Sequence, residues 1–158
     1  MKIGYLTFGR DDLAYGLALC LDSLRGHDIY RVSPKTAHYV DVLLFSCFWW
    51  EHNYLLAEFL RQAGIKKRDH KRPRIIIGGF NTFNPIPFQA YSDVVICGDG
   101  ERILPDVIQT GQDPGLIWRS VDPLRCFCHK TGNIARIEIA RGCRFRCPCH
   151  PAWSRKSR

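Results

Sequence analysis

The sequence has no apolar run long enough to cross a membrane and no recognisable export signal. Its longest apolar run, residues 42–50, is interrupted by Ser46, whereas a membrane-spanning helix needs about 20 apolar residues. The opening segment, MKIGYLTFGRDD, lacks the apolar core and the small-residue cleavage site of a signal peptide. We therefore expect a cytoplasmic protein that does not associate with a membrane.

Repeats and the common phosphate-binding and nucleophile motifs are also missing. The sequence has no internal repeat, no low-complexity segment apart from the basic ending at 154–158, no Walker-type phosphate loop and no nucleophile elbow. Nothing in it therefore predicts a P-loop nucleotide site or a serine hydrolase. A hydrophobic content of 46% over 158 residues excludes a disordered chain, and this length allows one domain with its own core plus a short further segment.

The net charge of +8 is concentrated in two segments. Residues 61–74 carry seven basic side chains against Asp69, and residues 136–158 carry seven against Glu138. Such basic segments attract nucleic acid or an anionic cofactor, but a solvated loop and a tail have the same composition. The sequence leaves both interpretations open.

Strands and helices alternate along most of the chain. Hydrophobic patterning predicts strands at residues 2–8, 28–32, 41–47, 74–77 and 93–97. It predicts helices at residues 11–25, 51–63 and 101–109. Gly64 ends the second helix, and Pro105 is expected in the first turn of the third. This alternation is typical of an α/β fold with a doubly wound parallel sheet.

The pattern changes after Gly111. Short predicted strands at residues 116–120, 124–128 and 134–139 are joined by turns at 122–123 and 131–133. We therefore expect an α/β domain over residues 1–112, a linker hairpin over 113–133, and a third segment over 134–158.

The eight cysteines fall into two groups. Without an export signal, metal ligation or burial is expected in place of disulfide bonds. Cys20, Cys47 and Cys97 lie singly in apolar segments and are predicted core residues. The other five crowd the last third of the chain: Cys126, Cys128, Cys143, Cys147 and Cys149.

The segment IEIARGCRFRCPCH, residues 137–150, places Cys143, Cys147 and Cys149 on one loop after a predicted strand. Three thiolates can hold three irons of a 4Fe-4S cluster and leave the fourth iron without a protein ligand. The segment resembles the cluster loop of radical S-adenosylmethionine (SAM) enzymes. The resemblance implies that SAM chelates the open iron, and that an electron from a flavodoxin or ferredoxin, passed through the cluster, cleaves SAM to a 5′-deoxyadenosyl radical.

The loop departs from the family pattern at one point. The family has CxxxCxxC, whereas here only Pro148 separates Cys147 from Cys149. One residue fewer moves the third thiolate by about 3.3 Å along an extended chain, and the fixed φ of proline resists the distortion needed to recover the site. We therefore expect the cluster to be labile or substoichiometric.

A zinc site and unliganded thiols are the competing interpretations of these cysteines. Two similar motifs, Cys126-x-Cys128-His129 and Cys147-x-Cys149-His150, together offer enough cysteine and histidine ligands for a tetrahedral zinc site. In that case the chain would be a non-catalytic Rossmann-like binding module, whose zinc-stapled basic tail contacts nucleic acid or a protein partner.

The upstream segment resembles the N-terminal cobalamin-binding-like, Rossmann-like domain that a subgroup of radical SAM enzymes carries. Where that domain has DxHxxG, this chain has Asp11-x-Leu13-x-x-Gly16. The third predicted strand ends at Ser46, and the fourth ends at Gly78-Gly79. The closing GEGE segment of the domain is similar to Gly98-Asp99-Gly100-Glu101. The resemblance implies a set of cofactor-binding residues: Asp11, Gly16, Ser46, Gly78, Gly79, Gly98 and Glu101. Leu13 replaces the histidine that would ligate cobalt. Two alternatives remain open: the domain binds cobalamin without that histidine, or it has kept the fold and lost the cofactor.

Two further groups of residues carry weaker signals. Four aromatic residues lie near the end of the third predicted strand: Phe45, Phe48, Trp49 and Trp50. At this end of a sheet they could form the base of a site for a flat ligand. We expect at least two of them to pack in the core instead. The histidines at 27, 38, 52 and 70 have no spaced partner and are predicted surface or turn residues.

Together these features predict the N-terminal portion of a radical SAM protein that ends soon after its barrel begins, with residues 134–158 supplying the first barrel strand and the cluster loop. The parent activity would be radical chemistry on an unreactive carbon, with methyl transfer if cobalamin is bound. A complete barrel needs about 200 further residues, so we expect no turnover by the chain alone and assign no catalytic side chain.

Overall fold

The computed structural model describes residues 1–8, 15–67, 69–113, 115–119, 128–131 and 134–137. The chain divides into two compact units, Met1–Arg119 and Ser120–Arg158, which are treated separately below. In the described part of the chain, no helix is long and apolar enough to cross a membrane.

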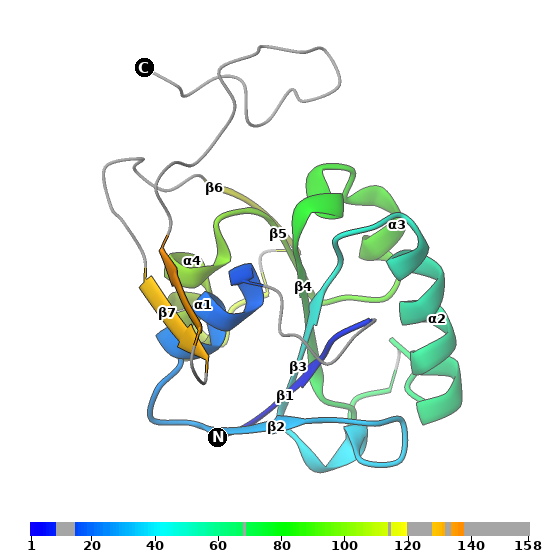
Figure 1. The fold of residues 1–158 in the computed structure, drawn as a ribbon. Coiled ribbons are helices and arrows are strands. Elements are labelled where there is room, and N and C mark those ends of the chain that lie inside the picture. Colours follow the sequence, from blue (N-terminus) through cyan, green and yellow to red (C-terminus); the bar gives the residue numbers. More distant parts are fainter. Residues whose placement is uncertain (9–14, 68, 114, 120–127, 132–133, 138–158) are drawn as a thin grey trace. The chain divides into compact units, whose positions relative to one another are not determined.

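The first unit is built on a six-stranded sheet in which all neighbouring strands are parallel (Figure 1). Its strands follow the order β2-β1-β3-β4-β5-β6. Their bounds are β1 Lys2–Leu6, β2 Asp28–Arg31, β3 Val42–Ser46, β4 Arg74–Gly78, β5 Val94–Gly98 and β6 Gly115–Arg119.

Helices cover both faces of this sheet (Figure 1). One face packs against α2 (Glu51–Ala63) and α3 (Ile86–Gln89), and the other against the helical segments α1 (Tyr15–Ser23) and α4 (Gly100–Thr110). Two short 3-10 turns, η1 (Ala37–Tyr39) and η2 (Phe80–Phe83), complete the described elements. This arrangement confirms the predicted doubly wound α/β fold.

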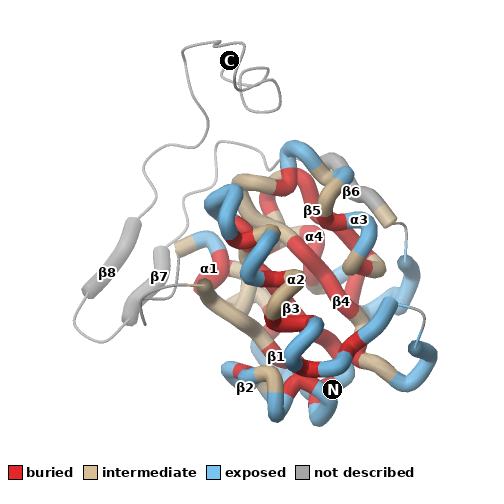
Figure 2. Tube along the Cα trace, turned by 90° about the vertical axis from the view of Figure 1, so that its right-hand side faces the viewer, coloured by how far each residue is buried: buried red, intermediate tan, exposed pale blue. Residues whose placement is uncertain are grey.

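Alternating side chains of the central strands divide the core into two layers. In β4, Ile75 and Ile77 join the cluster under α2, whereas Ile76 joins the cluster under α4. Because successive strand residues point to opposite faces, a strand covered on both sides must be apolar throughout. The buried centre of Figure 2 follows these strands. The continuous apolar runs that predicted β3, β4 and β5 therefore have a direct physical cause.

The ends of two helices test the predicted boundaries. Gly64 follows α2 in the left-handed conformation, with φ 69°, and its N–H donates to the carbonyls of Leu60 and Arg61 as a helix-ending residue should. The prediction for Pro105 is wrong in detail. It lies inside α4 beyond the first turn, because the helix begins at Gly100, ahead of the predicted start. It therefore removes an N–H that an interior residue would donate.

The strand predicted at residues 116–120 does not belong to the linker. β6 pairs in parallel with β5, with Val94 opposite Gly115 and Gly98 opposite Arg119. Returning from α4 to the open side of β5 completes another strand–helix–strand crossover, the connection that extends a parallel sheet. The first compact unit accordingly runs to Arg119 and not to residue 112.

The described part of the second unit is an antiparallel hairpin. It pairs β7 (Cys128–Thr131) with β8 (Ile134–Ile137), and Thr131 lies opposite Ile134. The turn predicted near residues 131–133 thus separates two strands. The boundary expected at residue 133 runs through this hairpin, and the strand expected to open the barrel pairs with β7 in the structure.

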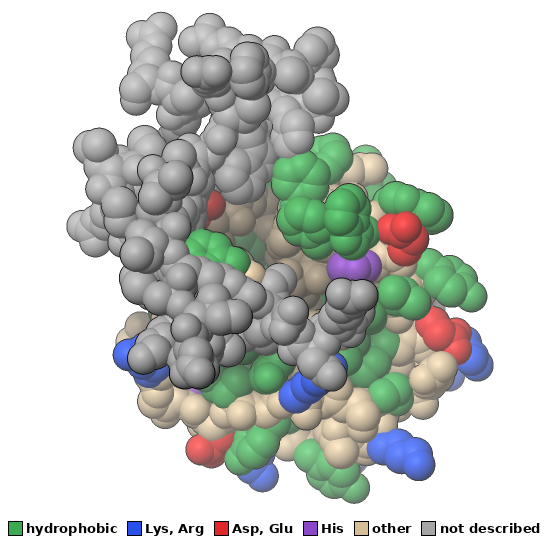
Figure 3. Space-filling model, in the orientation of Figure 1, with side chains coloured by type: hydrophobic (Ala, Val, Ile, Leu, Met, Phe, Trp, Pro, Cys, Tyr) green, Lys and Arg blue, Asp and Glu red, His purple; other side chains and the backbone are tan. Residues whose placement is uncertain are grey.

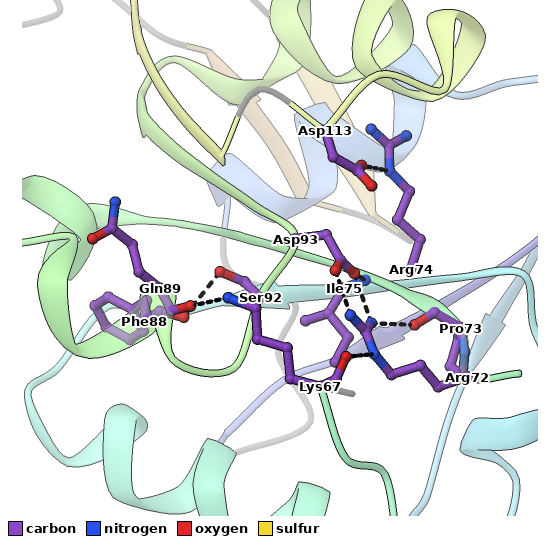
Figure 4. A network of polar contacts seen from close by, with 10 residues as sticks. All are labelled: Lys67, Arg72, Pro73, Arg74, Ile75, Phe88, Gln89, Ser92, Asp93 and Asp113. Carbon is purple, nitrogen blue, oxygen red and sulfur yellow. Dashed lines mark hydrogen bonds and ion pairs between the residues drawn. The ribbon is translucent and has the colours of Figure 1, made fainter. Parts of the chain in front are cut away.

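The amino end of the sheet is fixed by a buried ion pair between segments that enter β4 and β5 (Figure 4). Arg72 Nη1 donates to Asp93 Oδ2 at 2.7 Å, and Arg72 Nη2 also contacts this carboxylate. Asp93 Oδ2 accepts a further hydrogen bond, of 2.7 Å, from the N–H of Ile75. The Arg72 and Asp93 side chains are 8% and 14% exposed. This pair aligns the entries of two central strands.

The same contacts account for part of the basic segment at residues 61–74. Lys67 contacts the carbonyl of Gln89, and Arg74 donates to Asp113 Oδ1 at 2.5 Å (Figure 4). Together with Arg72, these cations serve the internal structure of the domain. Lys66 and Lys71 are exposed.

The Arg72–Asp93 pair predicts a large effect of Asp93→Ala on stability. The substitution leaves a buried guanidinium and the Ile75 N–H without their acceptor, so we expect the free energy of unfolding to fall by roughly 3 kcal/mol. Urea unfolding followed by circular dichroism measures this. Glu58→Ala is the control, because the Glu58–Arg61 pair is exposed. A loss no larger than that of Glu58→Ala would contradict the structural role.

Candidate functional site

The strand order places a ligand-binding edge at the carboxyl ends of β1 and β3. From β1 the chain continues to β2 on one side and then to β3 on the other, so the order reverses between β1 and β3. In open α/β sheets, ligands bind outside the carboxyl ends of the strands at such a reversal. The residues that follow β1, β3, β4 and β5 therefore define the candidate site.

Several of the predicted cofactor-binding residues lie together at this edge. Ser46, Gly78 and Gly98 are the last residues of β3, β4 and β5, and Ser46 lies opposite Gly78 in the β3–β4 register. Glu101 lies in the first turn of α4 and is buried.

Two further predicted residues, Gly16 and Asp11, follow β1 in the sequence. Gly16 is exposed near the start of α1. Asp11, like Leu13, lies outside the described residues.

Gly78 and Gly79 have different reasons to be glycine. A Cβ on Gly78 would meet nothing closer than the Ile96 carbonyl at 3.9 Å, which is ordinary contact, so packing does not require glycine there. Gly79 has a φ of 107°, and a Cβ on it would lie 2.6 Å from the carbonyl oxygen of Cys47. Backbone packing thus explains Gly79 without a ligand, whereas the contacts around Gly78 do not require glycine.

Hydrogen bonds join the loops that leave β3 and β4. The N–H of Cys47 donates to the Gly78 carbonyl at 2.7 Å, and the N–H of Asn81 donates to the Cys47 carbonyl at 2.9 Å. Asn81 Nδ2 also donates to the Trp49 carbonyl at 3.2 Å. The two loops consequently form one cross-linked structure above the sheet.

The predicted core cysteines are buried or partly buried. Burial raises the pKa of Cys47 to about 12. Burial also raises the pKa of Cys97 to about 11, and its thiol donates to the Thr82 carbonyl at 2.8 Å. Cys20 is partly buried and packs against the core. Cys47 and Cys97 are therefore protonated at neutral pH and unsuited to metal ligation.

His52 corrects the expectation that this histidine is a surface or turn residue. It is buried in the first turn of α2, and its ring centroid lies 5.1 Å from that of Phe8, which follows β1. Its Nδ1 accepts the N–H of Phe48 at 3.0 Å. His52 therefore connects α2 to the ends of both strands at the order reversal. His27, His38 and His70 are exposed, as predicted.

Electrostatics favour the neutral form of His52. Burial lowers the pKa of His52, and a hydrogen bond with the backbone of Ser46 and the charge of Glu51 offset that shift only in part. A neutral imidazole whose Nδ1 accepts a hydrogen bond carries its proton on Nε2. Protonation of Nδ1 would remove the acceptor for Phe48.

The aromatic residues around the end of β3 also differ from expectation. Phe45 is buried and contacts Phe59 in the core, at a ring-centroid distance of 5.5 Å. Phe48, Trp49 and Trp50 are exposed. The expectation that at least two of the four pack in the core is wrong, because β3 ends at Ser46 and the chain then leaves the covered part of the sheet.

Two buried polar residues, His52 and Asp99, were not assigned to the site from the sequence. His52 shares its helix face with the buried residues Leu56 and Phe59, and this spacing was a usable signal. Asp99 is buried between Gly98 and Gly100 at the carboxyl end of β5. A charged residue inside a glycine-rich strand end was likewise a signal.

The predicted iron ligands belong to a part of the chain that the structure does not describe. Among the described residues, no group of three or more His, Cys, Asp or Glu side chains is arranged to hold a metal ion. Cys143, Cys147 and Cys149 lie outside the described residues, as do Cys126 and His150. Cys128 and His129 belong to β7, for which only the backbone is described.

A comparison with protein families gives one match. The model described as "Radical SAM proteins, N-terminal" matches residues 26–115, which is more than half of the chain. The matched segment runs from the turn before β2 to the start of β6 and includes Ser46, Gly78 and Gly98. No curated protein and no solved structure gives a significant match.

The buried neutral His52 predicts a specific dependence of stability on pH. Because its pKa in the folded protein lies below the ordinary value of 6.5, the unfolded chain binds the proton more tightly. The free energy of unfolding should therefore fall as the pH drops below 6.5, until the pH passes the folded-state pKa. His52→Gln should reduce this slope in urea titrations between about pH 7 and pH 5.

His27→Gln is the matched control, because His27 is exposed. It should keep the wild-type slope. Equal slopes in wild type and His52→Gln would show that His52 is not held neutral by the fold.

Proposed function

Because this chain belongs to the family of radical SAM proteins, whose N-terminal domain it contains, we propose that it is the N-terminal portion of a protein that binds a 4Fe-4S cluster and SAM. One observation carries the proposal. The family match covers residues 26–115 of the doubly wound unit, and a segment with three closely spaced cysteines follows that unit in the sequence. The domain and the segment occur in the order that such a protein requires.

The chemistry of the donor set supports a cluster at Cys143, Cys147 and Cys149. Thiolate sulfur suits iron, and three ligands leave one iron of a cubane for SAM. Cys47 and Cys97 do not compete as ligands, because their burial keeps the thiols protonated. When bound, the cluster would supply the electron that cleaves SAM reductively.

The remaining parts of the proposal follow from that chemistry. Reductive cleavage needs one electron, so we include an electron donor of the flavodoxin or ferredoxin type. Thiolate ligands persist in a reducing compartment, and we therefore place the protein in the cytoplasm. We assign no catalytic side chain to this portion, and the cofactors would carry the radical chemistry.

Replacing single cysteines tests the cluster proposal. After anaerobic reconstitution of the full chain with iron and sulfide, Cys143→Ala, Cys147→Ala and Cys149→Ala should each abolish the broad visible absorption and most of the bound iron. Cys20→Ala is the matched control and should retain both, because Cys20 packs beside the core of the first unit.

Other outcomes would redirect the assignment. A colourless protein that keeps one zinc, and loses it on replacement of Cys126 or Cys128, would support the zinc-stapled binding module. Retention of the wild-type iron content in all three loop variants would remove the proposed ligands altogether.

Cobalamin binding at the carboxyl edge is the finer part of the proposal. Ser46 and Gly78 lie side by side there, and a Cβ on Gly78 would make only ordinary contact. Gly16, Gly98, Glu101 and Asp11 complete the proposed set. His52 does not replace the histidine missing at Leu13, because its Nδ1 is engaged by Phe48. A bound cobalamin would therefore lack a histidine ligand from this domain, and it would supply methyl-transfer chemistry.

Equilibrium dialysis against hydroxocobalamin tests this part separately. Wild type and Gly78→Ala should retain the cofactor, since a Cβ at this position meets only ordinary contact. Gly78→Leu should place a bulky side chain beside Ser46 at the strand end and weaken retention by tenfold or more, with an unchanged urea midpoint. Absence of retention by wild type at millimolar cofactor would mean that the domain keeps the fold without the ligand.

A further inference from the structure

Four aromatic rings form a continuous strip across the loops that leave β3 and β4. The ring centroids of Trp49 and Phe48 lie 4.9 Å apart, those of Phe48 and Phe80 lie 5.5 Å apart, and those of Phe80 and Phe83 lie 5.8 Å apart. We call these four residues the aromatic strip. Hydrophobic side chains gather over this end of the sheet in Figure 3.

Three of the four rings of the aromatic strip are exposed, and Phe80 is partly buried. Trp49 is 61% exposed, Phe48 47% and Phe83 39%. Scattered single apolar residues are common on protein surfaces, but a contiguous group of large rings marks a binding surface. Trp50 and Ile86 are also exposed and extend the apolar character of these loops.

The loops beneath the aromatic strip are held in place. Asn81 joins them through its contacts to the carbonyls of Cys47 and Trp49. The hydroxyl of Thr82 lies 2.7 Å from the carbonyl oxygens of both Gly79 and Ile96, which ties η2 to β5. His52 holds the N–H of Phe48. A ligand therefore meets rings that are already ordered, and it loses less free energy to ordering the site.

The chemistry of these loops restricts the ligand. Residues 46–50 and 78–91 contain no Asp, Glu, Lys, Arg or His. Within these two ranges no side chain can form an ion pair with a phosphate, carboxylate or ammonium group; the nearest charge along the chain is the exposed Glu51, which begins α2. What these loops offer is several ring faces and edges, which bind other π systems through dispersion and quadrupole contacts.

We propose that the aromatic strip is a binding site for a flat, uncharged, conjugated ring system, which packs against the exposed rings of the strip. In the radical SAM protein proposed above, this ligand would be the substrate. That identification rests on the proposed function, whereas the binding itself does not. The site is adjacent to the Ser46–Gly78 edge, since Phe48 follows β3 and Phe80 follows β4 by two residues each.

Lumichrome, a neutral tricyclic fluorophore, provides a direct test with the full chain and without cluster or cobalamin. We expect saturable quenching of its fluorescence by the wild-type protein. Trp49→Leu and Phe83→Leu keep an apolar side chain but remove a ring, and each should weaken binding by about tenfold or more. Tyr54→Leu is the control, because Tyr54 is an equally accessible aromatic on α2 outside the aromatic strip. It should bind as wild type does.

Three outcomes would overturn the proposal: no saturable quenching, unchanged binding by Trp49→Leu and Phe83→Leu, or displacement of lumichrome by equimolar 1-adamantanol. The last would mean that any apolar molecule suffices and that a planar ring is not recognised. Circular dichroism of each variant verifies the fold. Failure of this test leaves the cluster proposal intact, because that proposal is measured by iron content in separate variants.

Discussion

The arrangement at the carboxyl edge depends on one close approach between two backbones. Cys47 and Gly79 come so near that a single Cβ would overlap the peptide group, and the hydrogen bonds on either side hold this approach in register. Ser46 is thereby placed opposite Gly78, and η2 is brought beside the turn that precedes α2. Loss of this close approach would separate the Ser46–Gly78 edge of the sheet from the aromatic strip beside it.

Hydrophobic periodicity was sufficient to predict the sheet. Strands buried on both faces must be apolar throughout, and helices between them must carry one apolar stripe, so β3, β4, β5 and α2 lie within about a residue of their predicted bounds. The sixth strand was misassigned for a related reason. A short strand at the margin of a sheet has the same local pattern as a linker strand, and only its pairing with β5 distinguishes them.

The site was less predictable, because its properties arise from tertiary contacts. The glycines at the strand ends could be located, yet their different roles depend on where Cys47 and Ile96 lie. His52 is a polar residue type, which composition alone assigns to the surface, but it lies on the buried face of α2. The exposure of Phe48 and Trp49 depends on where the helical cover ends, and hydrophobicity alone predicts the opposite. Cysteine spacing, by contrast, is read from the sequence directly.

The position of β2 has a consequence for how the domain behaves before its neighbours are in place. β2 forms one margin of the sheet and is only four residues long, with exposed Asp28 and Arg31 at its two ends. A short, charged outer strand is a poor template for addition of a foreign strand. A growing or partly folded chain that exposes this margin is thus protected against edge-to-edge aggregation by the length and charge of the strand itself.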